Sequence, residues 1–191
     1  MTACSRHKIA VFASGQGSNF EAIVRASLAG EVNADVALLV SDNPSARVCQ
    51  IAREMGVETF VFAAKDYASK EEYERLIVEH CRQREVELIC LAGYMRIVGR
   101  VLLEAYRGAI VNIHPSLLPA FAGAKAIEQA VNYGVKVYGV TVHYVNQTLD
   151  GGEIIAQQAF GYEGSDIEEL TTMIHKVEHK LYIDTIKKLL K

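Results

Sequence analysis

The sequence predicts an α/β fold, with a doubly wound, mostly parallel sheet and a late antiparallel hairpin. Short apolar runs alternate with segments whose apolar residues recur at helical spacing, which is the order that βαβ units require. Two alternating runs at 138–145 and 154–160 flank a longer loop and predict the hairpin. The 191 residues contain no internal repeat or linker, so we expect one domain.

The individual elements follow from local patterns. Residues 8–13 are apolar and end in a glycine loop, and 20–29 have apolar side chains at helical spacing. Residues 88–92 are apolar throughout, as in a strand buried on both faces. Pro115 lacks an N–H group for a sheet ladder, so it ends the strand before it. Further strands are expected at 36–40, 59–62 and 110–113, and further helices at 46–55, 70–84, 101–106, 124–133 and about 165–190.

Two of these helices begin with a capping-box pattern, in which a serine precedes a glutamate by three residues. The pairs are Ser69 with Glu72, and Ser165 with Glu168. We therefore expect Ser69 and Ser165 to be the N-cap residues.

Composition and charge exclude several classes of function. Half of the residues are hydrophobic, 23% are charged and the net charge is −3, which argues against a phosphate-neutralising nucleic-acid surface. No apolar run has the length of a membrane span, and no signal peptide precedes the first strand. The four cysteines show no C-x-x-C spacing and are expected to be reduced and buried: Cys4, Cys49, Cys81 and Cys90. We expect a cytoplasmic protein.

The loop at 15–19 is the first candidate binding site. A strand, a glycine loop and a helix in succession direct backbone N–H groups toward an anion. The loop departs from the dinucleotide fingerprint, because Phe20 stands where a small residue is needed, although Asp42 resembles the ribose-binding acid. No Gly-Lys-Ser/Thr follows, so it is not a P-loop. A phosphate monoester is the expected ligand; the alternative is a tight turn that only starts a helix.

The second candidate site combines Asn112, His114 and Asp150. Alternation places Asn112 and His114 on one face at the end of a strand. A carboxylate orients an imidazole and stabilises its charged form, and an amide N–H can donate to a developing oxyanion. Together they suit direct acyl transfer from a nitrogen to an amine. The alternative is a turn asparagine beside a buried structural histidine. Ser116 lacks a nucleophile elbow, so a turn role is expected for it.

Other histidines give weaker signals. His175 and His179 are spaced as in zinc-binding helices, but the H-E-x-x-H order is absent, so no metal is expected. His143 alternates with Thr141 in a predicted strand and could line the same region, although a structural role is favoured.

Several motifs resemble those of the phosphoribosylglycinamide formyltransferases, folate-dependent enzymes of purine biosynthesis. The resemblance extends over almost the whole chain. It rests on residues 14–19, 91–97, 112–119, 139–143 and 149–152 and on the pair Glu178-His179. The asparagine, histidine and aspartate positions are shared with other 10-formyltetrahydrofolate enzymes, whereas the Gly-Ser-Asn loop is specific to the ribonucleotide branch.

The resemblance implies a single formyltransferase-like domain over 1–191. A Rossmann-type, phosphate-binding half would occupy about 1–105, and a catalytic and folate-binding half about 106–191. The formyl group of the co-substrate 10-formyltetrahydrofolate would pass to the amine of 5-phosphoribosylglycinamide. The residues implied to bind the ribonucleotide are Gly17, Ser18, Asn19 and Glu178. Those implied to bind the folate are Lys70, Met95, Arg96, Ile97, Val98 and Asn112.

Three positions depart from the family pattern. Lys70 stands where arginine is common, so a point charge replaces a bidentate fork. Glu153 replaces a proline after the Gly-Gly pair. Ile183 replaces a proline after Tyr182, so the last helix is expected to continue without a kink.

Alternatives within and outside this group fit less well. Methionyl-tRNA formyltransferase needs a C-terminal tRNA domain, and formyltetrahydrofolate deformylase needs an N-terminal regulatory domain. A non-catalytic nucleotide-binding module would need the glycine loop but not the Asn-His-Asp set. We expect small-molecule substrates and no nucleic-acid or membrane partner. The sequence leaves open whether the protein is a monomer or a weak homodimer.

Overall fold

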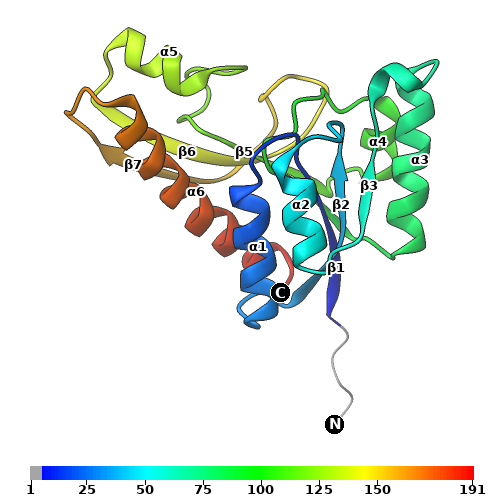
Figure 1. Ribbon diagram of the computed structural model, residues 1–191. Helices are drawn as coiled ribbons and strands as arrows, with labels where there is room; N and C mark the ends of the chain where they lie inside the picture. The colour runs from blue at the N-terminus through cyan, green and yellow to red at the C-terminus, as the bar shows by residue number, and fades with distance from the viewer. Residues whose placement is uncertain (1–5) are drawn as a thin grey trace.

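The computed structural model describes residues 6–191, which form one seven-stranded sheet with helices on its faces (Figure 1). The strands are β1 (His7–Phe12), β2 (Ala34–Ser41), β3 (Thr59–Val61), β4 (Leu88–Leu91), β5 (Ile110–His114), β6 (Val137–Tyr144) and β7 (Ile154–Gly161). The helices are α1 (Ser18–Leu28), α2 (Arg47–Glu54), α3 (Lys70–Gln83), α4 (Arg100–Ala105), α5 (Ala126–Tyr133) and α6 (Ile167–Leu189), with a 3-10 turn at Ala64–Asp66. Each element expected from the sequence is present.

The strand order is β3-β2-β1-β4-β5-β6-β7. Neighbours from β3 to β5 are parallel, and β6 is antiparallel to both β5 and β7, so the predicted fold class is confirmed. The chain moves outward from β1 to β3 and then returns to β4 on the other side of β1. In open α/β sheets, ligands bind beyond the carboxyl ends of the strands at such a reversal.

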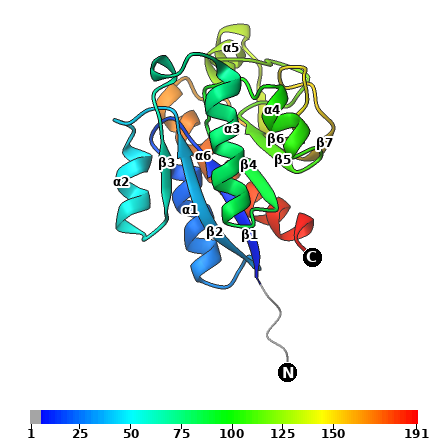
Figure 2. The same ribbon diagram turned by 90° about the vertical axis from the view of Figure 1, so that its right-hand side faces the viewer.

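Helices cover both faces of the sheet (Figures 1 and 2). Helices α1, α2 and α6 pack on one face with Ile9 and Val11, and α3 and α4 pack on the other with Ala10 and Phe12. Alternation along β1 therefore divides its side chains between two cores. Phe20, which breaks the dinucleotide fingerprint, is fully buried and anchors α1 to the first core.

Helix α6 is hydrogen-bonded to two of the strands that carry the candidate site. Tyr182 is fully buried, and its hydroxyl lies 2.9 Å from the carbonyl oxygen of Leu91 and 3.1 Å from that of Val111. Burial raises the pKa of Tyr182 well above its usual value, so the hydroxyl remains a donor. The helix continues through Ile183 to Leu189, as expected from the missing proline.

One predicted cap is confirmed and one is wrong. Ser69 caps α3 by accepting a 3.2 Å bond from the Glu72 N–H group. At α6 the N-cap is Asp166 rather than Ser165, because the Asp166 carboxylate accepts bonds from two successive N–H groups, at 2.8 and 3.3 Å. A charged acceptor at a helix N-terminus also interacts favourably with the helix dipole.

The cysteines that the structure describes are free and buried, as expected: Cys49, Cys81 and Cys90. Burial raises the pKa of Cys81 and of Cys90 to about 12, which keeps both thiols protonated and unreactive. Cys4 lies outside the described residues. Within residues 6–191, no helix combines the length and apolar character needed to cross a membrane.

Candidate active site

Three segments with candidate functional residues lie at or just beyond the ends of the adjacent strands β1, β4 and β5. They are the glycine loop 15–19, the segment 93–98 and the end of β5 around Asn112. Phe12 pairs with Leu91, and Leu91 pairs with Asn112, so the ends of the three strands lie side by side. The fold therefore places all three segments along one edge of the sheet, where the strand order reverses.

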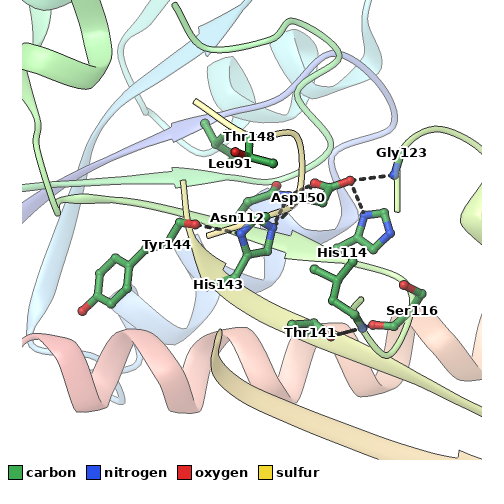
Figure 3. Close-up of polar contacts among 12 residues, drawn as sticks. Leu91, Asn112, His114, Ser116, Gly123, Thr141, His143, Tyr144, Thr148 and Asp150 are labelled. Carbon is green, nitrogen blue, oxygen red and sulfur yellow. Dashed lines mark hydrogen bonds and ion pairs between the residues drawn. The ribbon is translucent and has the colours of Figure 1, made fainter. Parts of the chain in front are cut away.

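Asn112 and His114 project from the same face of β5, as alternation predicts (Figure 3). Strand β6 runs antiparallel beside β5 and places His143 directly opposite Asn112. Opposed residues of antiparallel strands have neighbouring side chains. Asn112 Nδ2 lies 3.2 Å from His143 Nε2. The strand register therefore brings the His143 ring into the polar cluster, where it contacts Asn112, and the structural role favoured for it stays a prediction.

Asp150 reaches this cluster from the loop between β6 and β7. Its Oδ2 atom lies 3.5 Å from His114 Nδ1 and accepts a 2.8 Å bond from the Gly123 N–H group. Its Oδ1 atom lies 3.6 Å from His143 Nε2 and 3.5 Å from Asn112 Nδ2. The His143 ring, and then the Gly123 amide, lower the pKa of the Asp150 carboxyl, although burial opposes them. The carboxylate is therefore ionised at neutral pH.

The partners of each histidine define which nitrogen carries a proton. His114 Nε2 lies 2.9 Å from the Phe121 carbonyl oxygen, which can only accept, so Nε2 is the donor. The ring therefore gains or loses its second proton at Nδ1, which faces Asp150. By the same argument, His143 Nδ1 donates to the Tyr144 carbonyl oxygen at 2.8 Å, and its Nε2 atom faces both the Asn112 amide and Asp150 Oδ1.

The two loops around the site contain unusual backbone conformations. Phe121 has a φ of 55° and Asp150 a φ of 50°, in the left-handed region that costs a non-glycine residue on the order of 1–3 kcal/mol. These residues present the carbonyl and the carboxylate that contact His114. After Asp150 the loop passes so close to the Tyr144 carbonyl that a Cβ at Gly152 would collide with it. The second glycine of the Gly-Gly pair is thus required sterically.

Ser116 has the turn role expected for it. Its hydroxyl donates to the Ala120 carbonyl oxygen at 2.6 Å, and its own carbonyl accepts from the Thr141 hydroxyl at 2.7 Å. Thr141 Oγ1 also accepts from the Leu118 N–H group at 3.0 Å. These bonds attach the proline-bounded loop to β6.

The cluster has the groups needed to transfer an acyl group without an enzyme nucleophile. His114 Nδ1 can accept and return a proton, and the ionised Asp150 can stabilise an imidazolium. Asn112 has N–H groups that can donate to a developing oxyanion. The 3.5 Å contact of Asn112 Nδ2 with Asp150 is at the limit of hydrogen-bond distance. This N–H group can therefore readily donate to a ligand instead.

The glycine loop leads into an uncapped helix. Gly17 is the N-cap of α1 with a φ of 82°, and no side chain caps the helix. A Cβ at Gly17 would lie 2.7 Å from Cγ2 of Val48, so both the backbone conformation and the approach of α2 require glycine. The first N–H groups of α1 are therefore left for a ligand or solvent.

Glu178 of α6 lies beside this loop, so the structure brings together the two parts of the expected ribonucleotide site. Asn19 Nδ2 donates to Glu178 Oε2 at 2.9 Å. Asn19 Oδ1 is buried and has no hydrogen-bond partner among the described residues. Burial raises the pKa of Glu178, while the bond from Asn19 and the nearby His175 ring oppose the increase. A buried carboxylate with one donor is costly for the free protein.

Glu178→Gln is expected to stabilise the free protein at neutral pH. The folded-state pKa of Glu178 lies above the unfolded value of about 4.5, so between the two values the folded state binds more protons. Wild-type stability should therefore fall as pH rises through the folded pKa. When Tm is measured from pH 4.5 to 8, the Tm of the variant minus that of the wild type should increase with pH. A variant that is less stable than the wild type at pH 8 would contradict the sign of this effect.

In the segment after β4, three successive side chains are exposed and the next one is buried. Met95 and Ile97 are 75% and 66% exposed, and the Arg96 side chain is 45% exposed. Val98 is buried in the second core, so its side chain supports the segment from below. Exposed apolar side chains at the edge of a site are suited to cover a flat, apolar ligand.

Lys70 lies at the end of this segment. A Cβ built on Gly99 would lie 2.7 Å from Lys70 Cε. The Gly99 N–H group donates to the carboxylate of Glu74 at 2.5 Å. Burial raises the pKa of Glu74, and the Gly99 amide and Lys70 oppose the increase. Lys70 is therefore close enough to the segment to belong to the same site.

Two further features bear on ligands. A cavity of about 410 Å³ lies between α4 and residues 145–148, next to the loop that carries Asp150. His175 and His179 stack with ring centroids 6.5 Å apart. Among residues 6–191, no group of three or more His, Cys, Asp or Glu side chains is arranged to hold a metal ion.

A phosphate-type loop and an Asn-His-Asp acyl-transfer cluster on one α/β sheet define a group-transfer enzyme. The chain belongs to the formyl transferase family, whose sequence model matches residues 7–186.

Individual relatives agree with this assignment. The chain is 52% identical over 184 residues to phosphoribosylglycinamide formyltransferase of Bacillus subtilis, covering 96% of this chain and 94% of that protein. It is 41% identical to part of the trifunctional purine biosynthetic protein adenosine-3 of Drosophila melanogaster, covering 91% of this chain but 13% of that longer protein. The structure of glycinamide ribonucleotide transformylase 1 from Geobacillus kaustophilus is similar with a TM-score of 0.94 and 50% identity, covering 97% of this chain and all of that one.

Proposed function

We infer that this chain transfers the formyl group of 10-formyltetrahydrofolate to the amine of 5-phosphoribosylglycinamide. The products are the formylated ribonucleotide and tetrahydrofolate, and the reaction belongs to purine biosynthesis. The observation that carries this inference is the row of three segments on adjacent strand ends: a phosphate loop after β1, a partly apolar segment after β4 and the Asn-His-Asp cluster at β5.

We propose that the two substrates meet at the end of β5. Residues proposed to hold the ribonucleotide are Gly17, Ser18, Asn19 and Glu178, supported by the uncapped helix and the bond between Asn19 and Glu178. Residues proposed to hold the folate are Lys70, Met95, Arg96, Ile97, Val98 and Asn112, supported by the exposed apolar side chains of Met95 and Ile97. The folate site then draws on both proposed halves of the domain, about 1–105 and about 106–191.

The proposed reaction needs no covalent enzyme intermediate. Attack of the amine on the formyl carbon forms the new C–N bond, and Asn112 Nδ2 donates to the resulting oxyanion. His114 Nδ1 takes a proton from the attacking nitrogen and returns a proton to N10 of the folate as the old C–N bond breaks. Asp150 stabilises the imidazolium between these two transfers, and His143 holds the Asn112 amide in place.

We also propose that the protein acts on small molecules alone, in the cytoplasm. The free buried thiols are suited to a reducing compartment, and the net charge of −3 does not favour a polyanionic partner.

The acceptor assay tests the proposed function. The protein is incubated with 10-formyltetrahydrofolate and, separately, with 5-phosphoribosylglycinamide, methionyl-tRNA or water alone, and the loss of donor and the formylated product are measured. Turnover should require the ribonucleotide and should disappear in the His114→Ala variant, which controls for contaminating activity. Formylation of methionyl-tRNA, or donor hydrolysis as fast without the ribonucleotide as with it, would contradict the assignment.

A further inference from the structure

Ser14 connects the glycine loop to the segment after β4. It immediately precedes Gly15, and its N–H group donates to the Gly93 carbonyl oxygen at 3.0 Å. Its hydroxyl oxygen accepts from the Met95 N–H group at 2.8 Å. The residue just before the glycine loop is thus bonded to both ends of the turn that begins the proposed folate-binding segment.

Asp42, at the end of β2, completes this connection. The Ser14 hydroxyl donates to Asp42 Oδ1 at 2.5 Å, and Arg96 Nε donates to Asp42 Oδ2 at 2.9 Å. The Asp42 side chain is 9% exposed, whereas that of Arg96 is 45% exposed. Each oxygen of a nearly buried carboxylate is therefore bonded to a different one of the two binding segments.

The bonds share their atoms, so they are not independent. The Ser14 hydroxyl donates its proton to Asp42 while its oxygen accepts from Met95. A shift of Ser14 therefore changes the contacts of Met95 and, through the carboxylate, of Arg96. Hydrogen bonds to a charged carboxylate are stronger than bonds between neutral groups, so these bonds resist independent motion of the two segments.

We propose that Asp42, acting through Ser14 and Arg96, is a positioning residue that couples the two substrate sites, so that each ligand strengthens the binding of the other. The proposal rests on the proposed function, because it takes the loop and the segment as the sites of the ribonucleotide and the folate. A ligand on the loop orders Ser14, which then holds the folate segment in its binding conformation. The coupling must be reciprocal, since binding free energies are linked.

Calorimetric titration measures this coupling directly. The dissociation constant of folic acid, which has no formyl group to transfer, is determined with and without saturating 5-phosphoribosylglycinamide. The ratio of the two constants is the coupling. The wild type should show a ratio of about fivefold or more, the lower range of typical allosteric couplings. Asp42→Asn and Ser14→Ala should each reduce the ratio to less than about twofold.

Two further variants make the test specific. Arg96→Gln removes the exposed end of the bridge without disturbing the core, so it tests the coupling even if Asp42→Asn folds poorly. In Arg96→Gln, the ratio of the two dissociation constants should also fall below that of the wild type. Asp35→Asn is the matched control, because Asp35 lies at the opposite end of the same strand and pairs with Lys8 at the surface. It should keep the wild-type ratio.

The outcomes separate the proposal from the proposed function. If the wild type binds both ligands but shows no coupling, or if Asp42→Asn and Arg96→Gln keep the wild-type ratio, the bridge is only structural and the proposal is wrong. If the wild type binds neither ligand, the proposed function fails and the proposal fails with it. Restoration of the ratio in Asp42→Glu, which returns the charge, would support the bridge.

Discussion

Replacing His114 with alanine is expected to lower kcat by about two to four orders of magnitude, the usual contribution of a general acid–base residue. The ring is the group of the cluster whose free nitrogen, Nδ1, can take up a proton beside an ionised carboxylate. Without it, the site loses the group that takes the amine proton and returns a proton to N10 of the folate. The side chain is nearly buried, so removing it also leaves a small cavity. Circular dichroism and Tm should nevertheless show a folded protein.

Asp150→Asn tests the same step through the charge alone. The asparagine can still accept a bond from the Gly123 amide, so the loop should keep its conformation. The loss of the negative charge removes the stabilisation of the imidazolium, and kcat should fall by about tenfold or more. His7→Ala is the matched control, because that histidine pairs with Glu87 at the surface, away from the site. A steady-state assay in which either site variant turns over at near the wild-type rate would remove that residue from its proposed role.

The fold could be predicted because its determinants are local. Apolar runs, helical spacing and turn residues each specify an element over a few residues, and their alternating order specifies a parallel sheet. The shifted cap of α6 shows the limit of such patterns. Ser165 and Asp166 both precede a glutamate by three residues, and the sequence pattern does not rank them. The structure uses Asp166, whose carboxylate accepts two N–H bonds.

The site was predictable only in part, because its remaining contacts depend on strand register. Asn112 and His114 belong to one strand, so alternation alone places them on one face. His143 enters the cluster because β6 pairs with β5 in the register that sets it opposite Asn112. That register depends on a long connection through α5, which no local pattern specifies. The sequence contained one indication of this contact, because His143 alternates with Thr141 in a strand of the predicted hairpin.

The contacts of Asp42 could not be predicted from local sequence patterns either. Its position after a strand resembles that of a ribose-binding acid, but the dinucleotide fingerprint is absent. Its partners, Ser14 and Arg96, come from the ends of β1 and β4, which meet only when the sheet reverses its order. A residue that connects two loops has no signature within either of them.

Asn112→Ala is expected to lower kcat by about two to three orders of magnitude, the usual cost of removing an oxyanion donor. The amide is the neutral donor that faces Asp150 and His143 in the cluster, and its weak contact with Asp150 can be exchanged for a bond to the oxyanion. Because that bond forms only in the transition state, kcat and kcat/KM should fall by the same factor.

Steady-state kinetics with each substrate varied in turn separate this role of Asn112 from simple binding. The KM values for the ribonucleotide and the folate should stay within about threefold of the wild type, since an interaction made only in the transition state leaves ground-state binding unchanged. Asn132→Ala, on the exposed side of α5, is the matched control and should behave as the wild type. A large increase in the KM for folate with little change in kcat would instead restrict Asn112 to folate binding, and the oxyanion would then need another donor.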